Sequence, residues 1–125
     1  MIGIVIVAHG GLAKEYLAAI EHVVGSQNGV RAIAIYADHD RTEKQQEICQ
    51  AADAVDTGNG VVVVTDLFGG SPSNLSLLAC RPENRRILYG ANLPMLIKLA
   101  KSRDLEVPKR CAQLWRPVGS TLIAR

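Results

Sequence analysis

Four segments rich in Val and Ile alternate along this chain with four segments whose apolar residues recur at helical spacing. Strands are predicted at residues 2–8, 30–36, 61–65 and 86–89, and helices at about 12–24, 42–55, 71–79 and 92–103. The strand segments show little polar alternation, which is typical of strands buried on both faces of a parallel sheet. Because a helix follows each strand, right-handed crossovers should cover both faces with helices. We therefore predict a doubly wound α/β fold with a mostly parallel sheet.

The length and the order of these segments favour one domain. With 125 residues, the chain has the size of an ordinary single domain, residues 1–125. We expect the flavodoxin-like strand order 2-1-3-4, in which strands one and three are neighbours. The tail from about residue 105 is interrupted by Pro108 and Pro117, and its segment VGSTLIA suits a short C-terminal edge strand. An irregular tail and an edge strand both stay open.

Charge and nucleotide motifs exclude several classes of ligand. The formal net charge is +2, and the basic residues form no stripe, so we expect no nucleic-acid partner. We expect the pair Arg85-Arg86, and the single residues Arg81 and Arg103, on the solvated surface. Neither GxxxxGK[ST] nor GxGxxG occurs, so no nucleotide cofactor is expected.

Cysteine spacing and the first ten residues indicate the cellular compartment of the protein. The three cysteines form no CxxC pair, which suggests neither a disulfide framework nor a zinc site and favours a reducing cytoplasm; they are Cys49, Cys80 and Cys111. The opening MIGIVIVAHG is short, lacks a basic leader and is interpreted as a first strand, not a signal peptide. We expect no membrane insertion.

Short motifs predict where the helices begin. Thr42 and Gln45 have the spacing of a capping box at the start of the second helix. Ser71 and Pro72 suit the N-cap and first position of the third helix, and Asn92 is suited to cap the fourth.

Polar residues at the ends of two neighbouring strands predict the functional site. His9 ends strand one and Asp66 ends strand three, so both should meet at the carboxyl edge of the sheet, where such folds bind ligands. A carboxylate bonded to one ring nitrogen would fix the tautomer and leave the other nitrogen as a nucleophile. Gly69 and Gly70 would let the backbone approach an anion, and the helix beginning at Ser71 would favour it. Together these residues suggest phosphoryl transfer through a phosphohistidine.

His39, between two aspartates in DHD, has two interpretations. It is either a metal ligand or part of a solvated loop, and we favour the loop because one His and two adjacent acids make a poor ligand set. No metal site is therefore predicted.

Three segments carry a resemblance to a known family: IVIVAHGGLA, VVVVTDLFGGSPSN and GANLPMLIKL. In this order, over about the first hundred residues, they resemble the enzyme IIA domain of the mannose class in the bacterial sugar phosphotransferase system. The resemblance implies that His9 is phosphorylated by the histidine-containing phosphocarrier protein and passes the group to a IIB domain, here expected to be a separate protein. It also implies that Asp66 orients His9, that the loop with Gly69, Gly70 and Ser71 surrounds the phosphate, and that the protein is a homodimer whose C-terminal strand crosses to the partner.

Other functions are compatible with the same residues. A regulatory module would use its phosphorylation state to control a protein partner without sugar transport. The phosphocarrier subunit of dihydroxyacetone kinases is related, but the GGSP block favours the mannose class. A histidine phosphatase or mutase would need cationic phosphate ligands, and none is identified beside His9. The identity of the sugar is not predicted, because the IIA site of such a relay never touches it.

Overall fold

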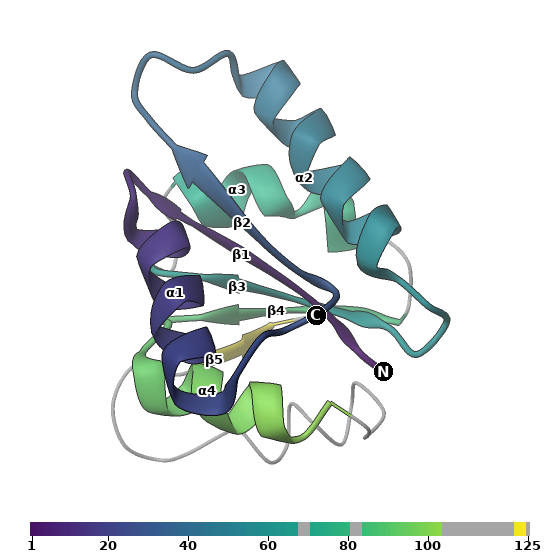
Figure 1. The fold of residues 1–125 in the computed structure, drawn as a ribbon. Helices are drawn as coiled ribbons and strands as arrows, with labels where there is room; N and C mark the ends of the chain where they lie inside the picture. The colour runs from purple at the N-terminus through teal and green to yellow at the C-terminus, as the bar shows by residue number, and fades with distance from the viewer. Residues whose placement is uncertain (68–70, 81–83, 104–121, 125) are drawn as a thin grey trace.

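The computed structural model describes residues 1–67, 71–80, 84–103 and 122–124. The elements alternate in the predicted way (Figure 1). They are β1 (Gly3–His9), α1 (Leu12–Val24), β2 (Val30–Ile35), α2 (Arg41–Val55), β3 (Val61–Thr65), α3 (Ser71–Ser76), the 3-10 helix η1 (Leu78–Cys80), β4 (Arg85–Tyr89), α4 (Leu93–Lys101) and β5 (Leu122–Ala124).

The strands form one sheet in the order β2-β1-β3-β4-β5. The first four are parallel, so the predicted order 2-1-3-4 is confirmed. β5 pairs antiparallel with β4 of the same chain, with Leu88 opposite Ile123, and this confirms the predicted C-terminal edge strand. The rest of the tail, including Pro108 and Pro117, lies outside the described residues.

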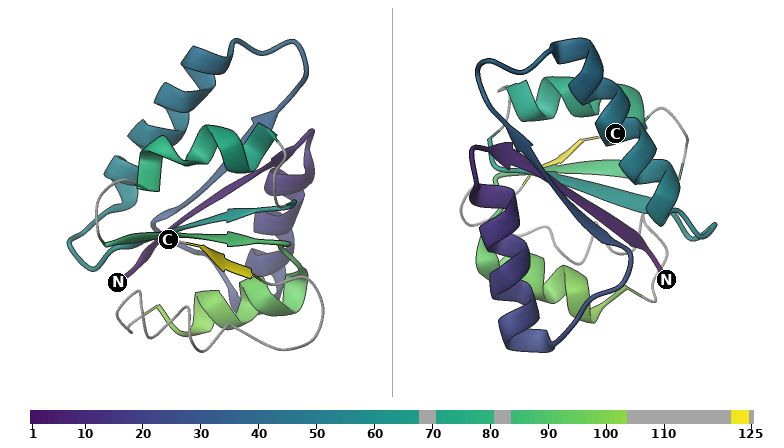
Figure 2. Two further views of the ribbon diagram at one scale, coloured as in Figure 1. Left: turned by 180° about the vertical axis from the view of Figure 1, so that it is seen from behind. Right: turned by 45° about the horizontal axis from the view of Figure 1, so that its top comes forward.

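Two apolar cores lie on the two faces of the sheet. Helices α1 and α4 cover one face and α2 and α3 cover the other (Figure 2). Successive strand residues point to opposite faces, so Val62 and Val64 join one core while Val61 and Val63 join the other. Burial on both sides explains why the segment VVVVT lacks polar alternation.

The helix starts follow local capping chemistry. Asn92 caps α4 as predicted, because its side-chain oxygen accepts a hydrogen bond from the Met95 N–H at 3.0 Å. The capping box predicted at Thr42 and Gln45 is wrong: Asp40 caps α2 and accepts a hydrogen bond from the Glu43 N–H at 3.0 Å. Ser71, the predicted N-cap, is the first residue of α3, so this helix begins one position earlier than predicted.

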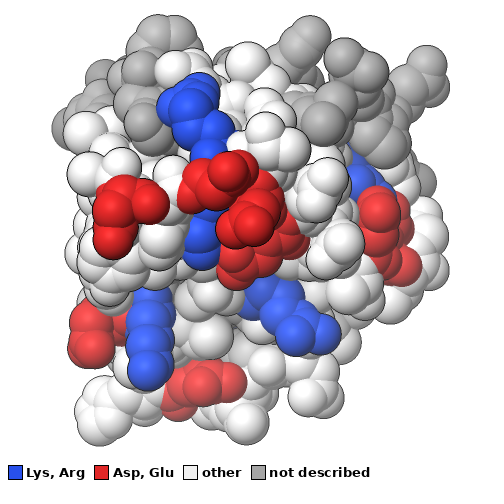
Figure 3. Space-filling model, turned by 90° about the horizontal axis from the view of Figure 1, so that it is seen from above, with Lys and Arg blue, Asp and Glu red and all other residues white. Residues whose placement is uncertain are grey.

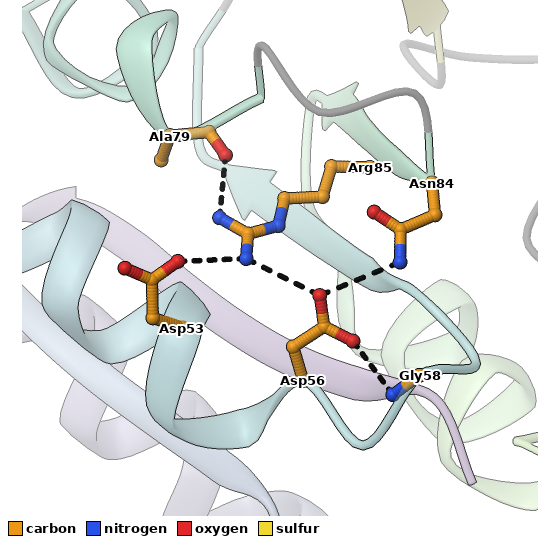
Figure 4. A network of polar contacts seen from close by, with 6 residues as sticks. All are labelled: Asp53, Asp56, Gly58, Ala79, Asn84 and Arg85. Carbon is orange, nitrogen blue, oxygen red and sulfur yellow. Dashed lines mark hydrogen bonds and ion pairs between the residues drawn. The ribbon is translucent and has the colours of Figure 1, made fainter.

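Arg85 is buried and not on the surface, which corrects the prediction for that residue of the basic pair. Its Nη2 donates to Asp53 at 2.7 Å and to Asp56 at 3.2 Å, and its Nη1 donates to the Ala79 carbonyl at 3.0 Å (Figure 4). These bonds join the end of α2, η1 and the first residue of β4. The guanidinium therefore clamps three elements at the amino edge of the sheet.

Arg103 is a second buried arginine, which also corrects its predicted surface position. Its Nε donates to the Ile2 carbonyl at 2.8 Å and its Nη2 to the Gly29 carbonyl at 3.2 Å. The residue thus joins the end of α4 to the chain just before β1 and β2. Arg81 lies outside the described residues.

Candidate functional site

His9 and Asp66 meet at the carboxyl edge of the sheet. β1 and β3 are direct neighbours, with Val7 opposite Thr65, so the residues that end these strands lie side by side. The ring Nδ1 of His9 lies 2.9 Å from Oδ2 of Asp66, and the His9 backbone N–H donates to the same oxygen at 3.1 Å. Their side chains are 49% and 10% exposed, respectively.

This geometry defines the tautomer of His9. An ionised carboxylate only accepts hydrogen bonds, so Nδ1 carries the proton and Nε2 keeps its lone pair. The second oxygen of Asp66, Oδ1, is buried, and no donor in the described part of the chain reaches it.

Gly10 turns the chain away from the site. Its φ of +57° lies in the left-handed region, which glycine adopts without strain, and its N–H donates to the Ile35 carbonyl at 2.9 Å. The chain can thus leave β1 directly after His9 and enter α1.

The other predicted phosphate ligands are only partly located. Gly69 and Gly70 lie outside the described residues. Ser71 begins α3, and the structure does not describe its hydroxyl group. Their predicted role in phosphate binding stays a prediction.

A pocket of about 360 Å³ opens beside His9. Cationic and imidazole groups from the segment after β2 line it, namely His39, Arg41 and Lys44, and Ile35 and Leu75 supply apolar walls. No cationic group was predicted beside His9 from the sequence, and the structure corrects this. The position of these cations could have been predicted from the strand order. β1 and β2 are adjacent and His9 is opposite Ile35, so the basic residues of ADHDRTEK, which begins two residues after Ile35, come close to His9.

His39 is fixed by its own loop. Its Nδ1 accepts a hydrogen bond from the Tyr36 N–H at 3.2 Å, and its ring lies edge-on to the Tyr36 ring with the centroids 5.1 Å apart. Because Nδ1 accepts, a neutral His39 carries its proton on Nε2. Within the described residues, no group of three or more His, Cys, Asp or Glu side chains could hold a metal ion.

The face on the α2 side carries charges of both signs. Seen from above, Lys and Arg side chains lie among Asp and Glu side chains over the described part of this face (Figure 3). Within α2, Lys44 and Glu47 form an ion pair, with Nζ and Oε1 2.8 Å apart. In the part of the chain that the structure describes, no helix has the length and apolar character needed to cross a bilayer.

Comparison with protein families decides the assignment. The family EIIA-man, described as "PTS system fructose IIA component", matches residues 3–112. The chain belongs to this family. EIIA-man proteins are components of the sugar phosphotransferase system, and the resemblance carried by the three sequence segments is thereby confirmed.

Individual EIIA-man relatives agree in sequence and in fold. The chain is 28% identical to the Escherichia coli protein "Putative phosphotransferase enzyme IIA component YadI" over 98% of this chain and 87% of that protein. It is 31% identical to the mannose-specific EIIAB component of Escherichia coli over 82% of this chain, but spans only 32% of that longer protein. The crystal structure of an EIIA component from Streptococcus agalactiae superposes with a TM-score of 0.81 at 28% identity, covering 91% of this chain and 89% of that one.

Proposed function

We propose that this chain is a phosphocarrier that receives a phosphoryl group on His9 from the histidine-containing phosphocarrier protein and passes it to a separate IIB component. The observation that carries the proposal is the bond between His9 Nδ1 and Asp66 Oδ2 at 2.9 Å. It leaves Nε2 as the nucleophile on a half-exposed ring, which a protein donor can reach. EIIA-man membership supports the same role.

The proposed phosphoryl transfer needs no cofactor, because one N–P bond forms as another breaks. The lone pair on Nε2 of His9 attacks the phosphorus of the donor's phosphohistidine, and a new N–P bond forms as the donor's N–P bond breaks. The donor imidazole keeps the electron pair of the broken bond. His9 then carries the phosphoryl group on Nε2 and a proton on Nδ1, so its ring is positively charged.

Asp66 stabilises that charge. Its Oδ2 already accepts from Nδ1, and its 10% exposure limits screening by water. The role resembles that of a carboxylate that orients a catalytic histidine and stabilises its imidazolium form. We propose that backbone groups of Gly69 and Gly70 and the Ser71 hydroxyl steady the transferring phosphoryl group.

Membership of EIIA-man supports three further proposals. The chain, residues 1–125, acts as one EIIA domain; it works in the cytoplasm, where phosphocarrier proteins reside; and it forms a homodimer. A phosphatase or mutase remains a rival, since the cations beside His9 meet one of its requirements. That rival predicts turnover of a free phosphoester.

Intact-protein mass spectrometry tests the carrier function. Wild type, His9→Ala and His22→Ala are incubated with phosphoenolpyruvate, enzyme I and the phosphocarrier protein, and are analysed at neutral pH because phosphohistidine is acid-labile. His22 lies exposed on α1, so its variant is a matched control. We expect wild type and His22→Ala, but not His9→Ala, to gain one phosphoryl group. Absence of the gain in folded wild type with an active donor would overturn the proposal.

A further inference from the structure

Among its described lining residues, the pocket beside His9 presents nitrogen donors and no carboxylate. Of its described lining residues, the polar side chains are those of His9, Tyr36, His39, Arg41 and Lys44. The acids that flank His39 in the sequence are absent from this lining. The carboxylate of Asp40, for example, accepts a hydrogen bond from the Glu43 N–H at 3.0 Å and caps α2. The pocket is thus suited to an anion.

Arg41 and His39 are the groups with spare donors. No ion-pair partner reaches Arg41 from the described residues, and its side chain is exposed at the start of α2. The Nδ1 of His39 is occupied by the Tyr36 N–H, so Nε2–H is the ring's remaining donor. Lys44 is already paired with Glu47 at 2.8 Å and contributes less net charge.

The ligand chemistry follows from the position of His9 in the same lining. A phosphoryl group on His9 carries two negative charges that lie next to this pocket. A guanidinium binds phosphate oxygens through paired N–H donors, and the N–H of a fixed imidazole would add a third hydrogen bond from another side. The volume of about 360 Å³ leaves room for the group and its water.

We propose that Arg41 and His39 bind the phosphoryl group carried on His9 and thereby favour the phosphorylated state of this chain over that of its donor. The inference rests on the proposed phosphocarrier function. It makes Arg41 and His39 phosphate-binding residues that set the direction of the relay, in addition to the loop that contains Gly69, Gly70 and Ser71.

The equilibrium constant of phosphoryl transfer tests this role. Phosphorylated donor, freed of enzyme I and phosphoenolpyruvate, is mixed with an equal amount of the chain until the ratio of phosphorylated forms is constant. The equilibrium depends only on the free proteins before and after transfer, so it does not change if a residue merely helps the donor to dock. Transfer rates in both directions are measured in parallel.

The variants are Arg41→Gln, His39→Gln and the control Arg31→Gln. Arg31 is exposed on β2 outside the pocket, and its replacement removes the same charge. We expect Arg41→Gln to shift the equilibrium toward the donor by roughly threefold to tenfold, the range between an exposed ion pair and a charge-assisted hydrogen bond. We expect a smaller shift in the same direction for His39→Gln, and none for Arg31→Gln.

The other outcomes separate the inference from the function. If Arg41→Gln slows forward and reverse transfer equally and leaves the equilibrium unchanged, Arg41 contacts the donor protein and the inference is wrong. An equal shift in Arg31→Gln would assign the effect to net charge and would also overturn it. If wild type accepts no phosphoryl group at all, the proposed function fails and the inference fails with it.

Discussion

One oxygen of Asp66 accepts two hydrogen bonds from His9, one from the backbone N–H at 3.1 Å and one from ring Nδ1 at 2.9 Å. The ring is therefore fixed relative to its own backbone, and its torsions have little freedom. In the proposed transfer, preorganisation of this kind would remove reorientation of the ring from the reaction step.

Replacing Asp66 by Asn tests the charge separately from the hydrogen bond. The amide oxygen can still accept from Nδ1–H, but it offers no negative charge to the positively charged ring of phosphorylated His9. We expect Asp66→Asn to slow phosphoryl transfer by about a hundredfold, the scale of one preorganised electrostatic contact to a reacting group. Single-turnover transfer followed by mass spectrometry gives the rate. Glu15→Gln, at an exposed position of α1, is the charge control, and an unchanged rate in Asp66→Asn would contradict the role given to Asp66.

Gly3 permits close packing between β1 and the end of α2. A Cβ atom at this position would overlap the carbonyl oxygen and side chain of Val55. We expect Gly3→Ala to lower the free energy of unfolding by roughly 1–3 kcal/mol, because the strand or the helix must move. Urea denaturation measures the change. At Gly11 no atom of the described chain lies within 4 Å of the place that a Cβ would occupy, so Gly11→Ala is the control and should cost less than Gly3→Ala.

Asp56 makes folding stability depend on acid pH. Burial raises the pKa of Asp56, but hydrogen bonds from the Gly58 N–H, from Arg85 and from Asn84 outweigh it and lower the pKa below the usual value. The unfolded chain therefore takes up this proton at higher pH than the folded chain does. The stabilisation is complete above the unfolded pKa of about 3.9 and is lost as the pH falls through the folded pKa.

The pH dependence of the free energy of unfolding, measured between about pH 2 and 6, tests this assignment. We expect Asp56→Asn to be less stable than wild type near pH 6 and to lose less stability than wild type on acidification. If Asp56→Asn lost as much stability in acid as wild type does, Asp56 would not be the responsible group.

The sheet and the meeting of His9 with Asp66 could be predicted from the sequence because both follow from local pattern. Apolar runs mark the strands, and parallel strands bring their carboxyl ends to one edge. The predicted cap of α2 was wrong because DRTEKQ contains two possible N-caps, Asp40 and Thr42. The Asp40 carboxylate caps the helix, two residues before the predicted position.

The buried arginines could not be predicted, because their partners are distant in sequence. Arg85 binds Asp53, 32 residues away, and Arg103 binds Ile2, 101 residues away. The local sequence of a basic pair next to an apolar run is the same whether the arginine is exposed to solvent or buried and bonded to distant residues. The cations beside His9 were missed for a different reason: the DHD segment after β2 was interpreted as a solvated loop or a metal ligand, and the residues after it were not placed near His9, although β2 was predicted beside β1.

The placement of Arg85 and Arg103 at the amino edge of the sheet has a consequence for adaptation. His9 and Asp66 lie at the opposite edge, and a five-residue strand such as β3 separates the two edges by about 16 Å. Substitutions this far apart with no shared partner usually have additive effects. A lineage, or an engineer, can therefore strengthen or relax the scaffold at one end while the proposed phosphocarrier site changes independently at the other.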